Sequence, residues 1–399
     1  MRSFFVTFLV AALGYFVDIY DLILFGVVRV ESLKAIGIAP ENLLSSGMLL
    51  INCQMIGMLI GGFFWGVLGD KKGRTVVMMA SILIYSLANI ANAFVGSLET
   101  YAILRFIAGF GLSGEVGAAV TLISESASKH RRTLWTTALT SFGLMGAVAA
   151  GLIGDNLHWK IAYLVGGGMG LLLLFLRFQV AESSMFKNSP TQNRGQLRLF
   201  VRSRKRFLRY LACVLIGVPI WYVVGILMTF SPELMKLEGM QQVVSAGDAI
   251  LFCYIGICLG DLLTGLLSHF VQSRKGVIGL FLFLDACGIT YYLHVSGLSL
   301  KEFYVLCSLL GFSVGYWGVY VTMIAESFGT NIRATAVVMA TNWMRGSMVL
   351  LTSSVQYLQQ YVSLSQSAFV VAGVVLSIAC LSLIYLTETF GKDLNYAET

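Results

Sequence analysis

Two aspartates, Asp18 and Asp21, stand three residues apart in an apolar stretch near the start of the chain. In a helix this spacing places both on one face. Two carboxylates so close together, and away from water, cannot both ionise cheaply, so one of them is suited to take up and release a proton. We predict Asp18 as the proton carrier and Asp21 as the second choice; the alternative is a structural cap or a permanently paired carboxylate.

A second charged stretch, residues 105–125, carries Arg105 near one end and Glu115 in its middle. Its length, roughly twenty residues at about 1.5 Å each, would cross a bilayer. A charge at that depth costs on the order of 3 kcal/mol unless it is paired or wetted. We therefore expect Arg105 to reach Asp18 as a proton switch, and Glu115 to contact a proton or a substrate. The alternatives are an Arg105 that extends to the membrane surface and a Glu115 that serves as a buried hydrogen-bonding group.

Arg345 interrupts another apolar stretch and could hold a substrate carboxylate through two parallel hydrogen bonds. Asn342 is assigned to the same site. Aromatic residues in two further apolar stretches could enclose a small ligand, although aromatic side chains in such helices more often serve packing. These residues are Trp221, Tyr222, Tyr316, Trp317 and Tyr320.

Several charged residues fall where apolar stretches end. They are Asp70, Arg74, Glu125, Arg132, Glu326 and Arg333. We expect salt bridges among them to close a gate at one face of the molecule, so that breaking them would favour opening. The alternative is that the basic residues record only the orientation of the chain in a membrane.

The elements that must position these residues are membrane helices. The 399 residues are 57% hydrophobic and 12% charged, about half the charge of a soluble protein. Apolar runs recur from end to end, which predicts an all-α membrane protein with twelve transmembrane helices in two six-helix bundles. The predicted spans are 3–28, 44–68, 75–95, 101–126, 133–155, 159–180, 207–230, 246–270, 276–293, 302–327, 335–361 and 365–386.

Basic residues gather in alternate loops, which predicts both termini in the cytoplasm and a multi-pass protein of the plasma membrane, the inner membrane in a bacterium. The net charge of +7 is therefore a topology signal and indicates no nucleic-acid partner. The seven cysteines all fall in apolar segments without a CxxC pair, so neither a disulfide nor a metal site is expected.

The chain contains a repeat. Seven residues recur, identical, 201 positions later, from Gly114 matching Gly315 to Arg132 matching Arg333. The one long polar break lies halfway along. We predict an N-terminal bundle at 1–180, a cytoplasmic linker at 181–206 and a C-terminal bundle at 207–399, the arrangement of transporters that rock two bundles about a central site.

Several motifs resemble those of one known family. Gly66 to Arg74, GVLGDKKGR, resembles the loop between helices 2 and 3 of the major facilitator superfamily. The stretch from Arg105 to Glu115 and the segment ESFGTNIRAT from Glu326 resemble its metabolite:proton symporter branch, which is related to the sugar porters. Asp18-Ile-Tyr-Asp21 resembles the acidic pair of that branch. The resemblance covers essentially the whole chain and implies a gating role for the charged residues at the helix ends.

The chain departs from that branch at three places. Ile19 stands where a tryptophan is usual, and Gly329 replaces a proline. The second-half counterpart of the Asp70 loop, residues 268–276, has no acidic residue, so we expect asymmetric gating.

The leading hypothesis is a secondary active transporter, not an enzyme, that imports a small carboxylate-bearing metabolite with protons. The proton would be its coupling ion and no other cofactor is expected; it would work as a monomer. Alternatives are a proton-coupled exporter of drugs or metabolites, an importer of zwitterionic osmolytes or a citrate-type siderophore, and a receptor that does not transport. The sequence contains no GxxxxGK[ST] motif, so it gives no indication of an ATP-driven pump.

Overall fold

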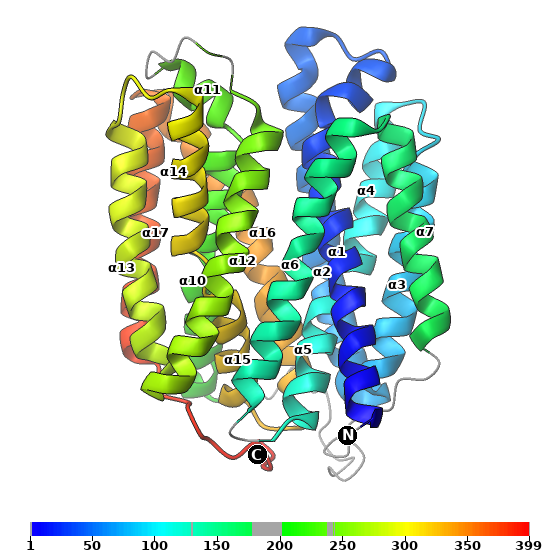
Figure 1. Cartoon of the computed structure of the whole chain (residues 1–399), viewed down its shortest axis with the longest axis vertical. Coiled ribbons are helices and arrows are strands. Elements are labelled where there is room, and N and C mark those ends of the chain that lie inside the picture. Colours follow the sequence, from blue (N-terminus) through cyan, green and yellow to red (C-terminus); the bar gives the residue numbers. More distant parts are fainter. Residues whose placement is uncertain (1, 129–130, 178–201, 238–241, 243, 399) are drawn as a thin grey trace.

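The structure, a computed structural model, describes residues 2–128, 131–177, 202–237, 242 and 244–398. Within these ranges the regular structure is entirely helical. The helices form two bundles side by side, and both termini lie at the same end, which we call the terminal face (Figure 1). Most of the predicted linker, up to residue 201, lies outside the described residues, and its last residues already belong to a helix.

The first bundle contains α1 (Arg2–Ala35), α2 (Leu43–Lys72), α3 (Arg74–Asn92), α4 (Leu98–Leu112), α5 (Glu115–Ser126), α6 (Arg132–Asn156) and α7 (Trp159–Arg177). The second contains α10 (Arg204–Tyr222), the π-helical turn η2 (Val223–Met228), α11 (Ser231–Leu237), α12 (Ala246–Val271), α13 (Arg274–His294), α14 (Leu300–Ser313), α15 (Trp317–Ser327), α16 (Arg333–Leu358) and α17 (Leu364–Tyr385).

Eleven described segments are long and apolar enough to cross a membrane by length and composition. The one predicted span missing from these eleven is the eleventh, α16, whose 26 residues are long enough but more polar, with Asn342 and Arg345 buried in it. The polar character of α16 follows from its place at the centre of the molecule, where its side chains meet the other bundle instead of lipid.

Two predicted spans are each broken into two helices. The fourth separates at Ser113–Gly114 and the tenth at residues 314–316. Glycine is required here because neighbouring backbones come too close for a side chain: a Cβ on Gly315 would lie 2.7 Å from the Cα of Gly260. The two breaks are 201 residues apart, as the repeat requires.

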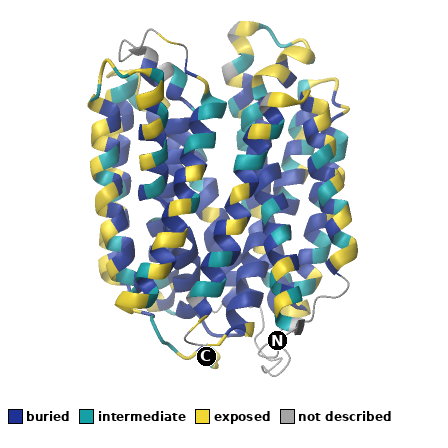
Figure 2. Ribbon diagram, in the orientation of Figure 1, coloured by how far each residue is buried: buried dark blue, intermediate teal, exposed yellow. Residues whose placement is uncertain are grey.

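The exposed residues lie on the outer sides of the helices and at their ends, and the buried residues lie toward the centre (Figure 2). Phe175, Leu350 and Ile384 each expose 70% or more of their surface. Asp18, Arg105 and Arg345 are buried. A molecule that exposes large apolar side chains and buries charges is built for lipid surroundings.

Two helix pairs join the bundles, α2 with α16 and α6 with α12, and α5 and α15 complete the interface toward the terminal face. These contacts are close because glycines line them. A Cβ on Gly117 of α5 would lie 2.4 Å from the side chain of Val338, and one on Gly265 of α12 would lie 2.4 Å from that of Thr137. The interface therefore brings residues from both repeats into direct contact.

Candidate functional site

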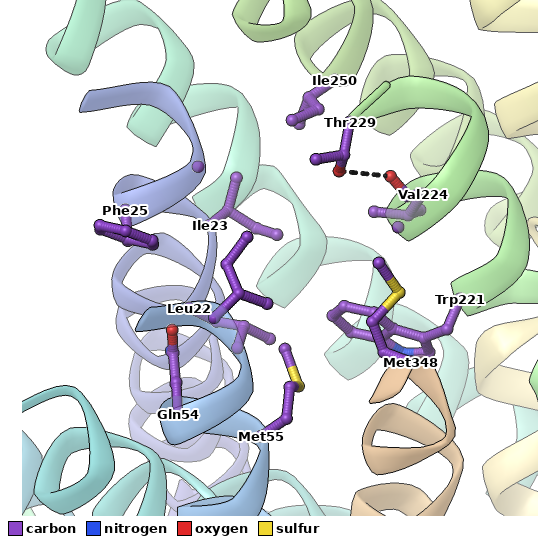
Figure 3. A pocket seen from close by; sticks show the side chains of 13 residues that line it. Leu22, Ile23, Phe25, Gln54, Met55, Trp221, Val224, Thr229, Ile250 and Met348 are labelled. Carbon is purple, nitrogen blue, oxygen red and sulfur yellow. Dashed lines mark hydrogen bonds between the residues drawn. The ribbon is translucent and has the colours of Figure 1, made fainter. Parts of the chain in front are cut away.

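Two small cavities lie between the bundles and share Trp221 and Val224 on their walls. One has a volume of about 50 Å³, and Figure 3 shows Gln54 and Met55 on one side of it and Trp221 and Met348 on the other. The second, of about 20 Å³, is lined by Arg345 together with aromatic residues. Volumes of this size hold a few water molecules, so a metabolite requires the walls to separate further.

Arg345 is the one charged residue on the wall of the smaller cavity. It is 1% exposed, and its guanidinium carbon lies 5.7 Å from the centre of the Trp317 ring. Its Nε and Nη1 atoms find no hydrogen-bond partner among the residues that the structure describes. A buried cation with unused donors is costly by itself, and a carboxylate that accepts from one of these donors would supply a hydrogen-bond partner and a counter-ion together.

The aromatic residues predicted for the substrate site divide into two groups. Trp221 and Trp317 line the cavities. The hydroxyl of Tyr222 instead donates to the carbonyl of Ala368 at 2.7 Å, and that of Tyr316 donates to the carbonyl of Ile216 at 3.0 Å.

Two other residues predicted for this site also lie outside the cavity walls. Tyr320 lies beside Trp317 with ring centres 5.7 Å apart and the ring planes tilted by 41°, and it is fully buried. Asn342 donates to the carbonyl of Ser113 at 2.8 Å, a contact between the two bundles. Trp221, Trp317 and Arg345 therefore form the part of the predicted site that the fold brings together.

Asp18 and Asp21 are both fully buried in α1, as their apolar surroundings suggested. None of their four carboxylate oxygens has a hydrogen-bond partner within the described part of the chain. Ile19, next to Asp18 on α1, lines the smaller cavity together with Arg345 of the other bundle, and the charge of Arg345 acts on Asp18. The proton-carrying candidate and the candidate anion site are thus neighbours.

The expected pairing of Arg105 with Asp18 is wrong for this conformation. Arg105 donates from Nη2 to Oδ1 of Asn89 at 2.7 Å and from Nη1 to Oε1 of Gln54 at 3.5 Å. It also lies 5.4 Å from the centre of the Tyr163 ring. Neutral amide oxygens and an aromatic face contact the guanidinium, while its Nε has no hydrogen-bond partner among the described residues. The acid on which its charge acts is Asp21.

Glu115 forms an ion pair that the sequence analysis did not find. Arg177, at the last turn of α7, donates to both carboxylate oxygens, with Nη1 to Oε2 at 2.8 Å, and also to the carbonyl of Met78. The pair is buried against Gly14 of α1, where a Cβ would collide with both side chains. A lone arginine at the end of an apolar span was the available signal, since a buried charge needs a partner.

The six predicted gating residues meet at the terminal face, where they are buried. Glu125 accepts from Arg74 at 2.9 Å and from Arg333 at 3.0 Å. Glu326 contacts Arg132 at 3.4 Å and Arg274 at 3.1 Å. In each cluster the glutamate belongs to one bundle and one of its arginines to the other, so each cluster joins the two bundles at the terminal face.

Asp70 makes a different kind of contact between the bundles. Its carboxylate accepts hydrogen bonds from the backbone N–H groups of Ala334 and Thr335 and from the Thr335 hydroxyl, at 2.7–3.2 Å. An anion at the first turn of α16 satisfies the unpaired N–H groups there. In the second half, the loop that corresponds to that of Asp70 has no acid; its Ser268 accepts a hydrogen bond from Arg274 instead. The two contacts between the bundles, α2 with α16 and α6 with α12, therefore differ. We call these two contacts the seams.

The sequence matches the Major Facilitator Superfamily across residues 4–353. The chain belongs to this family. The niacin transporter NiaP of Acinetobacter baylyi is 28% identical over 362 residues, which cover 82% of this chain and 80% of that protein. The gentisate transporter of Corynebacterium glutamicum is 25% identical over 345 residues, 80% of this chain and 73% of that protein.

A solved structure has the same fold. The proton:xylose symporter XylE of the major facilitator superfamily, bound to 6-bromo-6-deoxy-D-glucose, aligns with a TM-score of 0.77 over 99% of this chain and 98% of its own, at 18% identity. The twelve-helix facilitator architecture predicted from the sequence is thereby confirmed. The protein is a multi-pass membrane transporter of a small molecule and not an enzyme.

Proposed function

We propose that this facilitator imports a small carboxylate-bearing metabolite together with protons by alternating access. The observation that carries the proposal is the pair of unused guanidinium donors of Arg345 at the cavity wall, with the unpaired carboxyl of Asp18 nearby. A substrate carboxylate would satisfy Arg345. It would also weaken the hold of Arg345 on the ionised form of Asp18, so that substrate binding would favour proton binding.

Two further observations support the substrate class. Trp221, Trp317 and Tyr15 give the cavity flat apolar walls around the single cation, which suits a compact anion with an apolar body. The named substrates of the two relatives, niacin and gentisate, are small carboxylic acids with one ring.

The direction of transport and the orientation belong to the same proposal. Both termini would lie in the cytoplasm, because described basic residues such as Lys71, Lys72 and Lys275 lie toward the terminal face. A cavity of about 240 Å³ between the start of α2 and the end of α16, lined by Met48 and Gln356, then opens on the outside. The closed gate at the terminal face would make this the outward-facing half of the cycle of a monomer in the plasma membrane, the inner membrane in a bacterium.

Uptake into proteoliposomes tests the proposal. Labelled nicotinate, gentisate, citrate, proline and glycine betaine are each offered with and without an inward proton gradient, to the wild type and to Asp18→Asn. The expected result is gradient-driven accumulation of a carboxylate by the wild type, and exchange without accumulation by the variant. Uptake that does not depend on the proton gradient overturns the symport assignment. Uptake restricted to the zwitterions proline and glycine betaine overturns the proposed substrate class.

A further inference from the structure

Asp261 of α12 is a buried acid that ties the two bundles together near mid-membrane. Its Oδ2 accepts from the Thr140 hydroxyl at 2.7 Å and from the Ser141 hydroxyl at 2.8 Å, both on α6 of the other bundle. Its Oδ1 accepts from the N–H of Gly318, at the start of α15, at 2.6 Å. Asp261 is 0% exposed and lies outside the cavities described above.

The repeat shows that this acid is not required by the architecture. At the other seam, Thr341 and Asn342 occupy the places of Thr140 and Ser141, 201 positions later. There Asn342 bridges the bundles to the Ser113 carbonyl, and the residue of α2 that faces Asn342, in the place of Asp261, is Gly62. A neutral bridge is therefore sufficient to join the bundles. Joining them does not explain why the α6–α12 seam has a carboxyl group.

The hydrogen bonds around Asp261 can be completed in either of its charge states. The Thr140 hydroxyl has one proton and two acceptors, Oδ2 of Asp261 and the carbonyl of Thr137 at 3.0 Å. With Asp261 ionised, Thr140 donates to the carboxylate. With Asp261 protonated, the acid donates to Thr140 and Thr140 donates to Thr137, while Ser141 and Gly318 still donate as before.

The charged form has no cation to compensate it. Asp261 joins none of the ion pairs in the described part of the chain, and the titratable groups that face it are Tyr15 of α1 and Cys258 of its own helix. Neither carries a positive charge. Because an ion buried without a counter-ion is expensive, the protonated form is favoured while the seam remains closed.

The gate lies between Asp261 and the terminal face. Asp261 stands ten residues before the end of α12 at Val271, about 15 Å along the helix. The Arg132–Glu326 contact closes the same seam beyond it, where α6 begins and α15 ends. Separation of α6 from α12 and α15 at the gate would break the bonds from Thr140 and admit water to the carboxyl.

We propose that Asp261 is a second proton-exchanging group of the transport cycle, sealed in its protonated form on the α6–α12 seam and deprotonated when the gate at the terminal face opens. In that step the O–H bond of the acid breaks, the proton passes to water in the opened cavity, and the carboxylate remains. The inference rests on the alternating access of the proposed function, but not on the identity of the substrate.

Infrared difference spectroscopy of the purified full chain in lipid tests this without any substrate. Spectra recorded across a pH titration should contain a carboxylic acid C=O band that Asp261→Asn removes. Asp285→Asn is the matched control, since Asp285 is equally buried in the second bundle but, among the described residues, accepts only from Ser313 of that bundle. Absence of any band difference between wild type and Asp261→Asn overturns the proposal.

Opening the gate supplies the second measurement. Glu125→Gln combined with Glu326→Gln should move the titration of the Asp261 band to lower pH, because water then reaches the carboxyl. Thr140→Val, which removes the relay hydroxyl, should displace the band, whereas Thr140→Ser should not. A band that titrates identically with the gate closed and open overturns the release step.

These spectra separate the two proposals. If no compound of the uptake panel is transported, the proposed function fails while the infrared result still stands. If Asp18→Asn uncouples uptake but no band belongs to Asp261, the proposed function survives and this inference fails.

Discussion

Glu125 of α5 accepts a hydrogen bond at 3.0 Å from Arg333 of α16, in the other bundle. Their counterparts 201 positions away, Glu326 and Arg132, make the reciprocal contact at 3.4 Å. Each repeat thus supplies the acid for one cluster and the base for the other. Both clusters therefore form only when the two bundles are in contact, since neither half can complete a cluster alone.

Removing an acid from either cluster should open the gate. Glu326→Gln leaves Arg132 and Arg274 without a counter-ion, and loss of one partner of a buried pair costs about 3–5 kcal/mol. That is enough to shift a two-state equilibrium by more than about a hundredfold toward the open form. The measurement is the distance between spin labels placed on α6 and α12 near the terminal face.

Glu125→Gln should give the same shift at the α2–α16 seam. Glu302→Gln, at the start of α14, is the control and should leave the distances unchanged, because Glu302 caps its own helix and touches neither cluster. Unchanged distances in both gate variants would contradict the assignment of these clusters as a gate.

Arg345 should control the affinity for anions. A hydrogen bond to a charged group contributes about 1.5–3 kcal/mol, so Arg345→Gln should raise KM for a transported carboxylate by roughly 10–100-fold. Arg345→Lys keeps the charge but loses the paired donors, so its KM should lie between those of the wild type and Arg345→Gln. Concentration-dependent uptake measures both, and a KM that does not change in Arg345→Gln would remove this residue from the substrate site.

The Glu115–Arg177 pair should matter for stability first. Glu115→Gln leaves the buried Arg177 uncompensated and should cost about 3–5 kcal/mol, whereas Glu115→Gln combined with Arg177→Met should recover much of the loss. Thermal unfolding in detergent compares the three proteins. A stable Glu115→Gln variant that has lost proton-driven uptake would instead support the proton-coupling role predicted for Glu115.

Glu388, after the end of α17, should contribute to stability in a pH-dependent way. Its partial burial opposes ionisation, but hydrogen bonds from the Ser273 hydroxyl and from the backbone N–H groups of Arg274, Phe390 and Thr389 outweigh it, and the pKa of Glu388 lies below its usual value. A carboxyl whose pKa falls on folding stabilises above its unfolded pKa and loses that contribution as pH falls through the folded pKa.

The wild type should therefore unfold at a higher temperature than Glu388→Gln at neutral pH, and the difference should shrink as the solution becomes acid. Asp393→Asn is a suitable control, since Asp393 makes only a local bond to the N–H of Asn395. A difference that grows toward low pH would contradict the sign of the shift.

Many residues of the candidate site could be predicted from the amino-acid sequence. Charged residues such as Asp18, Glu115 and Arg345 stand out in apolar stretches because burial of a charge in a membrane demands a reason, and repeat spacing located the gating glutamates and arginines.

The contact partners of those charged side chains could not be predicted from the sequence. Arg105 is held by Asn89 and Gln54 and not by Asp18, Glu115 is held by Arg177, and Asp261 is held by hydroxyls of the opposite bundle. A sequence determines which residues must avoid lipid, because that depends on the cost of burying each side chain. Which partner each one meets depends on how the two bundles are rotated and spaced, and only the packing of the whole chain decides that.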